Sequence, residues 1–179
     1  MAIGLKVAGE DPRVTRTRSL LREALESLLQ EKSFGSISVL DIAERATLNR
    51  ATFYAHYADK FELLEAVIRG LFREALAEGD PLALADDAGA LRTISVNVFR
   101  FVEKHTQCKL DTQFEPQFER AVHAELYACL AERYDDAAAL VSRTAIIGAA
   151  MQWRRNGYKE RAERIAEQIV EVLSRGIAS

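Results

Sequence analysis

Three helix starts lie within residues 36–60, and their close spacing constrains the fold more than any other feature of the chain. Each start carries a side chain that can accept a hydrogen bond from the free amides of a first helical turn. The starts are Ser38 with Asp41 three positions on, Asn49, and Asp59 with Glu62 three positions on. The middle segments span only about two turns, too short to be stable alone. Longer helices on both sides must therefore hold them.

Hydrophobic residues recur at helical spacing along the rest of the chain, and only three prolines interrupt them. The expected helices cover about 15–31, two turns after Ser38, 50–57, 60–78, 84–105, 116–134, 135–155 and 159–177, with the stretch 80–91 ambiguous. The sequence predicts an all-α fold whose two halves pack as one compact molecule.

The charge distribution is more informative than the net charge of −3. Residues 13–60 hold eight Lys/Arg and six Asp/Glu, whereas residues 61–179 hold fifteen and nineteen. This asymmetry permits a nucleic-acid partner for the N-terminal part alone. No apolar run is long enough to cross a bilayer, and the first dozen residues do not resemble a secretory signal. We therefore expect a cytoplasmic protein without a membrane partner.

The short third helix carries the residues best suited to contact DNA. With Asn49 as its cap, Arg50, Ala51 and Thr52 occupy the first turn, while Phe53 and Tyr57 can pack inward. An arginine can bond guanine bidentately, and a threonine or alanine methyl can contact thymine. A short helix held between two others, with such residues at its exposed end, is typical of a helix-turn-helix. The alternative is a solvated face on an ordinary helix pair.

Residues 16–68 resemble the DNA-binding domain of the TetR (tetracycline repressor) family in the leucine-rich first helix, the S-x-x-D-I-A opening, T-F-Y and D-K. The resemblance implies base contacts by Arg50, Ala51, Thr52 and His56, and phosphate contacts by Tyr54 and Lys60, with Ser38 or Thr47. One departure is Thr47-Leu48-Asn49, where many members have Gly-Val-Ser. The loss of this glycine is tolerable if Thr47 keeps a negative φ.

The same resemblance implies a helix-turn-helix domain over 13–60, a connecting helix over 61–78 and a ligand-sensing, dimerising domain over 79–179. In such a dimer, two antiparallel helices of each copy form a four-helix bundle. Independently, residues 137–150 are small and apolar enough for close helix contact, although they could simply be the monomer's core. A homodimer suits a pseudo-palindromic operator in double-stranded DNA, with half-sites about one helical turn apart.

A small apolar effector could lie between helices of the C-terminal half. The candidate contacts, each of which could equally be plain core, are Phe99, Phe114, Phe118, Tyr127, Met151 and Trp153. His105 and His123 have no companion ligands, so we expect no metal site. Cys108, beside Lys109, could be a redox switch or an idle thiol, and Cys129 is undecided.

The sequence therefore predicts a dimeric, sequence-specific transcriptional regulator, a repressor under the control of an effector. The alternative is a helical adaptor or sensor of the same fold that does not bind DNA. An enzyme is disfavoured because the sequence contains no nucleophile–base pair, phosphate loop or metal cluster at recognisable spacing. No cofactor is expected.

Overall fold

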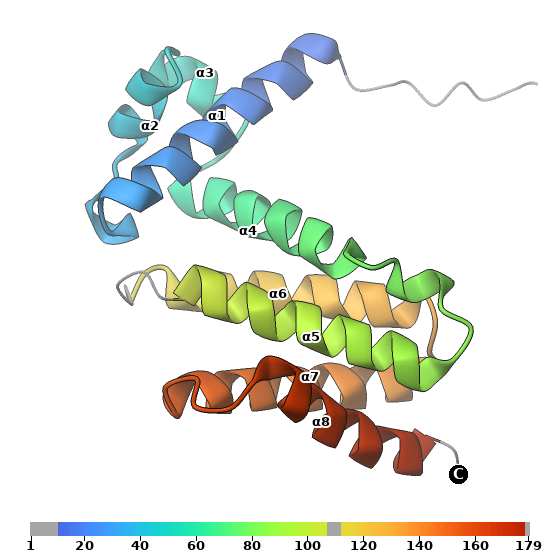
Figure 1. The fold of residues 1–179 in the computed structure, drawn as a ribbon. Helices are drawn as coiled ribbons and strands as arrows, with labels where there is room; N and C mark the ends of the chain where they lie inside the picture. The colour runs from blue at the N-terminus through green and yellow to red at the C-terminus, as the bar shows by residue number, and fades with distance from the viewer. Residues whose placement is uncertain (1–10, 107–111, 178–179) are drawn as a thin grey trace, which may run out of the picture. The chain divides into compact units, whose positions relative to one another are not determined.

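The computed structural model describes residues 11–106 and 112–177, and within these ranges its regular elements are all helices (Figure 1). The elements are α1 (Pro12–Glu31), η1 (Phe34–Ser36), α2 (Val39–Arg45), α3 (Arg50–Tyr54), α4 (Lys60–Ala77), η2 (Pro81–Ala83), α5 (Asp87–Thr106), α6 (Glu115–Ala131), α7 (Asp136–Arg155) and α8 (Ala162–Ile177). The predicted all-α class is confirmed. Among the described helices, none is long and apolar enough to span a membrane.

The chain forms two compact units that divide between Leu64 and Glu65, inside α4. Unit 1 contains α1–α3 and the first turn of α4, and unit 2 contains the remainder of α4 and α5–α8. Each unit has its own buried core, and the packing of the two halves as one molecule stays a prediction. The predicted connecting helix over 61–78 corresponds to α4, which belongs partly to each unit.

The core of unit 1 is built by the apolar stripe of α1 and the inward residues of α2 and α3. Leu21 and Leu25 of α1 are fully buried, as are Ile42 of α2 and Phe53 of α3. The first helix starts three residues earlier than predicted because Asp11 accepts a hydrogen bond from the amide of Arg13 and Pro12 occupies the first turn.

Polar contacts fix α2 against the C-terminal end of α1. Arg45 donates to both carboxylate oxygens of Glu31, each at 2.8 Å, and to Ser27 Oγ at 2.5 Å. Lys32 forms an ion pair with Asp41 at 3.0 Å. These contacts set the position of the helix on which α3 is mounted.

Unit 2 is a bundle in which α5 packs against α7 and α8, and α6 packs against α7 (Figure 1). Aromatic rings fill its interior: Phe101 contacts Phe72 at 4.7 Å and Phe118 at 5.8 Å between ring centroids, and Phe99 contacts Trp153 at 5.3 Å. Fully buried leucine, isoleucine and valine side chains complete this core.

The ambiguous stretch 80–91 contains the largest departure from the predicted helices. Gly79 and Asp80 both have positive φ, which ends α4 and directs the chain into η2 before α5 begins at Asp87 rather than residue 84. Helix α8 similarly begins at Ala162 rather than 159, after Gly157 and Tyr158, which also have positive φ. Left-handed residues interrupt the helical hydrogen-bond ladder, so apolar periodicity alone misplaced these starts.

Candidate nucleic-acid interface

The turn between α2 and α3 is a helix C-cap in which Thr47 has a φ of +56°. Its amide donates to the carbonyl of Glu44 at 3.0 Å, and the amide of Leu48 donates to the carbonyl of Ala43 at 2.8 Å. This pair of bonds is the Schellman motif, whose left-handed position is usually occupied by glycine. The condition under which the loss of glycine would be tolerable, a negative φ at Thr47, is not met, because the Schellman bonds place this residue in the left-handed conformation.

The predicted caps of α2 and α3 are confirmed. Ser38 accepts from the amide of Asp41 at 3.1 Å while the Asp41 carboxylate accepts from the amide of Ser38 at 2.7 Å, which completes a capping box. Asn49 Oδ1 accepts from the amide of Thr52 at 2.7 Å and from its hydroxyl at 3.0 Å. The Thr52 hydroxyl is thus engaged in the cap.

Helix α3 is shorter than predicted, because it ends at Tyr54 rather than Tyr57. The amides of His56 and Tyr57 both donate to the carbonyl of Phe53, so the last turn tightens instead of continuing. Phe53 and Tyr57 are buried, as predicted, and hold the short helix on the core of unit 1.

The exposed side of α3 presents a guanidinium beside a phenol. Arg50 Nη2 lies 3.4 Å from Tyr54 Oη, and the guanidinium carbon lies 5.9 Å from the centroid of the Tyr54 ring. Tyr54 is 49% exposed; Ala51 is also exposed, whereas His56 is partly buried. This surface offers a donor fork, an aromatic hydroxyl and a methyl group, which is the chemistry that base edges and phosphates bind.

Lys60 differs from its predicted surroundings. Its ammonium donates to the carbonyls of Phe34 at 3.0 Å and Ile37 at 2.8 Å, and lies 4.6 Å from the Phe34 ring centroid. The neighbouring amides of α4 are also engaged, because Asp59 Oδ1 accepts from Phe61 and Glu62. In this arrangement Lys60 stabilises η1, a role that its motif position did not predict.

Two cations outside the motif add to the charge of unit 1. Arg13 and Arg16 are exposed on α1. Both contribute to the positive charge of residues 13–60, although no motif marks them as site residues. Their position on an exposed helix could be inferred from the apolar periodicity of 20–29, which puts them off the buried stripe.

The six predicted effector contacts are found in or beside the core of unit 2. Phe99 and Phe118 are fully buried, and Met151 and Trp153 nearly so. The Trp153 indole donates to the carbonyl of Glu160 at 2.8 Å. Phe114 stacks on Phe118 with ring centroids 5.7 Å apart, and Tyr127 donates to Asp136 at 3.1 Å. These contacts are those of packed helices.

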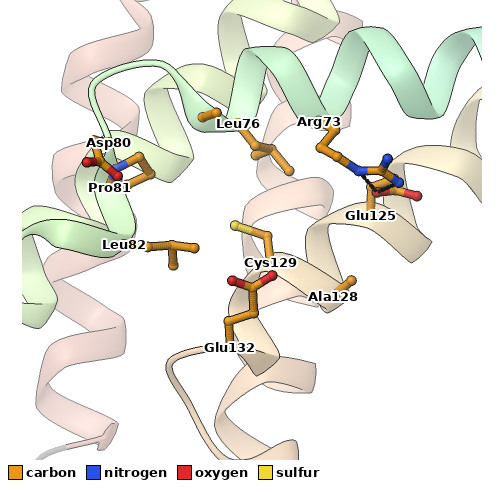
Figure 2. Close-up of a pocket in the computed structure, with 10 residues that line it drawn as sticks. Arg73, Leu76, Asp80, Pro81, Leu82, Glu125, Ala128, Cys129 and Glu132 are labelled. Atoms are coloured by element: carbon orange, nitrogen blue, oxygen red, sulfur yellow. Dashed lines mark hydrogen bonds and ion pairs between the residues drawn. The ribbon is translucent and has the colours of Figure 1, made fainter. Parts of the chain in front are cut away.

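A cavity of about 320 Å³ lies elsewhere in unit 2, and none of those six residues lines it (Figure 2). Its lining comes from α4, the η2 segment and α6: Arg73, Leu76, Ala77, Asp80, Pro81, Leu82, Glu125, Ala128, Cys129 and Glu132. Sequence reasoning missed it because these residues come from separate segments and share no motif.

The remaining candidates for chemistry are unreactive or outside the described ranges. Burial raises the pKa of the Cys129 thiol to about 11, so it remains protonated at neutral pH. Burial lowers the pKa of His105 to about 4. Within residues 11–106 and 112–177, no three His, Cys, Asp or Glu side chains group as metal ligands. Cys108 lies outside the described residues.

A capped bracing helix, a Schellman turn and a short helix with an exposed Arg–Tyr pair define a helix-turn-helix DNA-binding domain. Residues 21–67 match the family model described as bacterial regulatory proteins, tetR family. Over these residues the chain is similar to the tetR family.

Curated relatives match over the same part of the chain. The HTH-type transcriptional regulator YxbF of Bacillus subtilis (strain 168) is 45% identical over 60 residues, which are 33% of this chain and 16% of YxbF. The HTH-type dhaKLM operon transcriptional activator DhaS of Lactococcus lactis subsp. lactis (strain IL1403) is 32% identical over 60 residues, 34% of this chain and 32% of DhaS. The chain therefore matches only a sixth to a third of these relatives' lengths.

Solved structures resemble the whole fold at low sequence identity. A TetR transcriptional regulator from Streptococcus agalactiae 2603V has a TM-score of 0.57 and 21% identity over 90% of this chain and 95% of its own. The multidrug binding protein EbrR, solved with imidazole, has a TM-score of 0.59 and 17% identity over 95% and 97%. These likenesses show that the helical fold of unit 2, and not only the helix-turn-helix, is shared with the solved structures.

Proposed function

We propose that the protein is a dimeric, sequence-specific DNA-binding regulator of transcription, a repressor whose operator affinity a small-molecule effector controls. The observation that carries this proposal is the exposed Arg50–Tyr54 pair at the end of a helix capped by Asn49 and braced by α2. A DNA target implies that it acts in the cytoplasm, as a binding protein rather than an enzyme.

Within this proposal, the residues of the motif divide into base readers and backbone anchors. Arg50, Ala51, Thr52 and His56 would face base edges in the major groove, with Arg50 bidentate to a guanine. Tyr54, Ser38 and Thr47 would contact phosphates. Lys60 would contribute mainly long-range positive potential, since protein carbonyls already accept bonds from its ammonium.

The dimer would form through the outer faces of α7 and α8. Leu140 and Val141 of α7 are 48% and 57% exposed, and Val172 of α8 is 70% exposed. Apolar side chains this exposed on adjacent helices favour burial against a second copy. A two-fold axis there would pair two reading helices with half-sites about 34–36 Å apart, and so with a pseudo-palindromic operator.

Binding-site selection from random duplex DNA, followed by a titration of the selected site, tests the DNA-binding proposal. We expect an inverted repeat, and an affinity that falls with rising salt. Arg50→Ala should cost about 1–3 kcal/mol of binding free energy and relax the preference at one base step. Tyr54→Phe, the matched comparison, should weaken all sequences similarly. Equal affinity for every duplex would contradict sequence specificity, and no binding to any duplex would leave a helical adaptor that does not bind DNA.

Placement of the selected site upstream of a reporter gene tests the sign of regulation. A repressor lowers transcription from a promoter that overlaps its operator, and the Arg50→Ala variant should restore that transcription. Higher transcription in the presence of the wild-type protein would make the protein an activator, the class to which the name of DhaS assigns that relative.

A further inference from the structure

The cavity in unit 2 has two facing helical walls and a loop wall (Figure 2). Helix α4 contributes Arg73, Leu76 and Ala77, and α6 contributes Glu125, Ala128 and Cys129, each set at the i, i+3, i+4 spacing of one helix face. Glu132, the C-cap of α6, continues the second set. The η2 segment closes one side with Asp80, Pro81 and Leu82. The cavity is thus formed by regular elements.

Two polar side chains hold the loop wall in place. Asn97, which is buried on α5, donates to the carbonyl of Glu78 at 2.8 Å and caps the end of α4. Arg133 donates to the carbonyl of Leu84 and to Asp87, each at 2.8 Å. Since both ends of the segment are fixed, the cavity is formed before any ligand enters.

The charges around the cavity do not balance. Arg73 is satisfied by Glu125, to which it donates twice, at 2.8 Å and 3.1 Å, and the Glu125 carboxylate is nearly buried. The structure describes no hydrogen bond or ion pair for the carboxylates of Asp80 and Glu132, both exposed at the cavity. Two unpaired negative charges therefore remain on the lining.

Helix polarity adds to this negative potential. Helix α4 ends at Ala77 and α6 ends at Ala131, so both carboxyl termini lie at the cavity. A helix carboxyl terminus carries about half a negative charge and favours cations. The thiol of Cys129, whose pKa burial raises, stays neutral and adds apolar surface beside Leu76 (Figure 2).

We infer that this cavity binds a small organic cation with an apolar body, whose positive group lies near Asp80 and Glu132 and whose body contacts Leu76, Pro81, Leu82 and Ala128. The inference rests on the proposed function in one respect, because it identifies this cation as the effector. An organic anion would meet two unpaired carboxylates and two helix carboxyl termini. A neutral ligand would gain the apolar contacts but no electrostatic attraction to the negative potential of the cavity.

Titration calorimetry with three aromatic probes of similar size tests the charge preference. The probes are benzyltrimethylammonium, its neutral isostere neopentylbenzene, and 3-phenylpropanoate. We expect measurable binding of the cation, weaker binding of the isostere and none of the carboxylate, with the cation's affinity falling as salt rises. Equal or tighter binding of the isostere or the carboxylate would overturn the inference.

Substitutions locate the binding. Glu132→Gln and Asp80→Asn should each weaken cation binding about threefold and together about tenfold, in the range of exposed ion pairs. Glu74→Gln, an equally exposed acid on α4 that does not line the cavity, is the matched control and should change nothing. Ala128→Trp, at an exposed lining position, should fill the cavity and abolish binding of both cation and isostere. Unchanged cation affinity in Ala128→Trp would place the binding elsewhere.

The effector role has its own readout. Addition of benzyltrimethylammonium should change the affinity of the wild-type protein for its selected operator and leave that of Ala128→Trp unchanged. If the cation binds but operator affinity stays constant, the effector role is overturned while the site stands. If no duplex is preferred at all, the proposed function fails, and calorimetry still decides whether the cavity takes a cation.

Discussion

Thr47 is a β-branched residue whose backbone is in the left-handed conformation, which few residues other than glycine adopt without strain. The Schellman bonds of the turn between α2 and α3 keep it there. The hydrogen bonds of the turn impose this conformation on Thr47, and their stabilising energy offsets its backbone strain.

Replacement of Thr47 by glycine should therefore stabilise the protein. The left-handed conformation costs a residue with a Cβ about 1–2 kcal/mol, and the greater unfolded-state entropy of glycine offsets part of this gain. We expect a net increase of about 0.5–1 kcal/mol in the free energy of unfolding, measured by urea denaturation. Thr47→Ala, which keeps a Cβ, should gain much less. A lower midpoint for Thr47→Gly would contradict the assignment of strain.

Lys60→Ala should lower the thermal stability of the protein, independently of any contact with DNA. The substitution removes a charged donor from the carbonyls of Phe34 and Ile37, and hydrogen bonds to charged groups contribute about 1.5–3 kcal/mol. Thermal unfolding of the variant is the measurement, with the exposed Lys159→Ala on unit 2 as its control. Unchanged thermal stability combined with weaker DNA binding would assign Lys60 to phosphate contact alone.

At the scale of elements, the contact between α1 and α2 should depend on pH. Hydrogen bonds from Ser38 and Lys32 hold the pKa of Asp41 well below its usual range, and the bond from Arg45 lowers the pKa of Glu31. A carboxyl with a lowered folded-state pKa stabilises the fold above its unfolded pKa, about 4, and this stabilisation is lost as the pH falls further.

Urea midpoints measured between pH 7 and pH 3 test this dependence. The wild-type midpoint should fall below about pH 4, and Asp41→Asn should be less stable at pH 7 yet lose less on acidification. Asp86→Asn, at an exposed carboxylate of unit 2, offers a comparison outside the capping box. If the wild type and Asp41→Asn lost equal stability on acidification, the capping box would not be the cause.

The starts of α2 and α3 could be predicted because capping is local chemistry, whereas the cap of α1 at Asp11 was not predicted. Ser38 and Asn49 form the caps that their side chains and spacing indicate. Glu62 differs by one position, because it accepts from the amide of Ala58 rather than of Asp59. The end of α3 could not be predicted, because nothing in the residue pattern indicates that the amides of His56 and Tyr57 both donate to the carbonyl of Phe53.

At the scale of the whole molecule, oligomeric state should depend on the outer faces of α7 and α8. Val141→Glu and Val172→Glu would place charges on the proposed interface, where an unpaired buried charge is strongly unfavourable. We expect both variants to be monomers by light scattering coupled to size-exclusion chromatography. Leu40→Glu, at an exposed leucine of α2, should remain a dimer. A monomeric wild type would contradict the proposed dimer outright.

The family resemblance implied two domains, but the division inside α4 and the cavity were not predictable from helical periodicity. Helical periodicity shows which face of a helix is buried but not which helix buries it, so it could not separate one core from two. The cavity depends on the left-handed residues Gly79 and Asp80 and on the contacts of Asn97 and Arg133. Tertiary contacts of this kind between distant residues leave no local pattern in the amino-acid sequence.

The division between the units inside α4 also has a consequence for folding. Helix formation is cooperative, because each residue added extends an existing ladder whereas a new start costs nucleation. Leu63 and Leu64 are fully buried in one unit and Phe72 in the other, so packing in both units stabilises the hydrogen-bond ladder of the same helix. If either unit unfolded, its half of α4 would lose its packing. The hydrogen-bond ladder of α4 in the remaining unit would then be shorter. We therefore expect the stabilities of the two units to be coupled through α4.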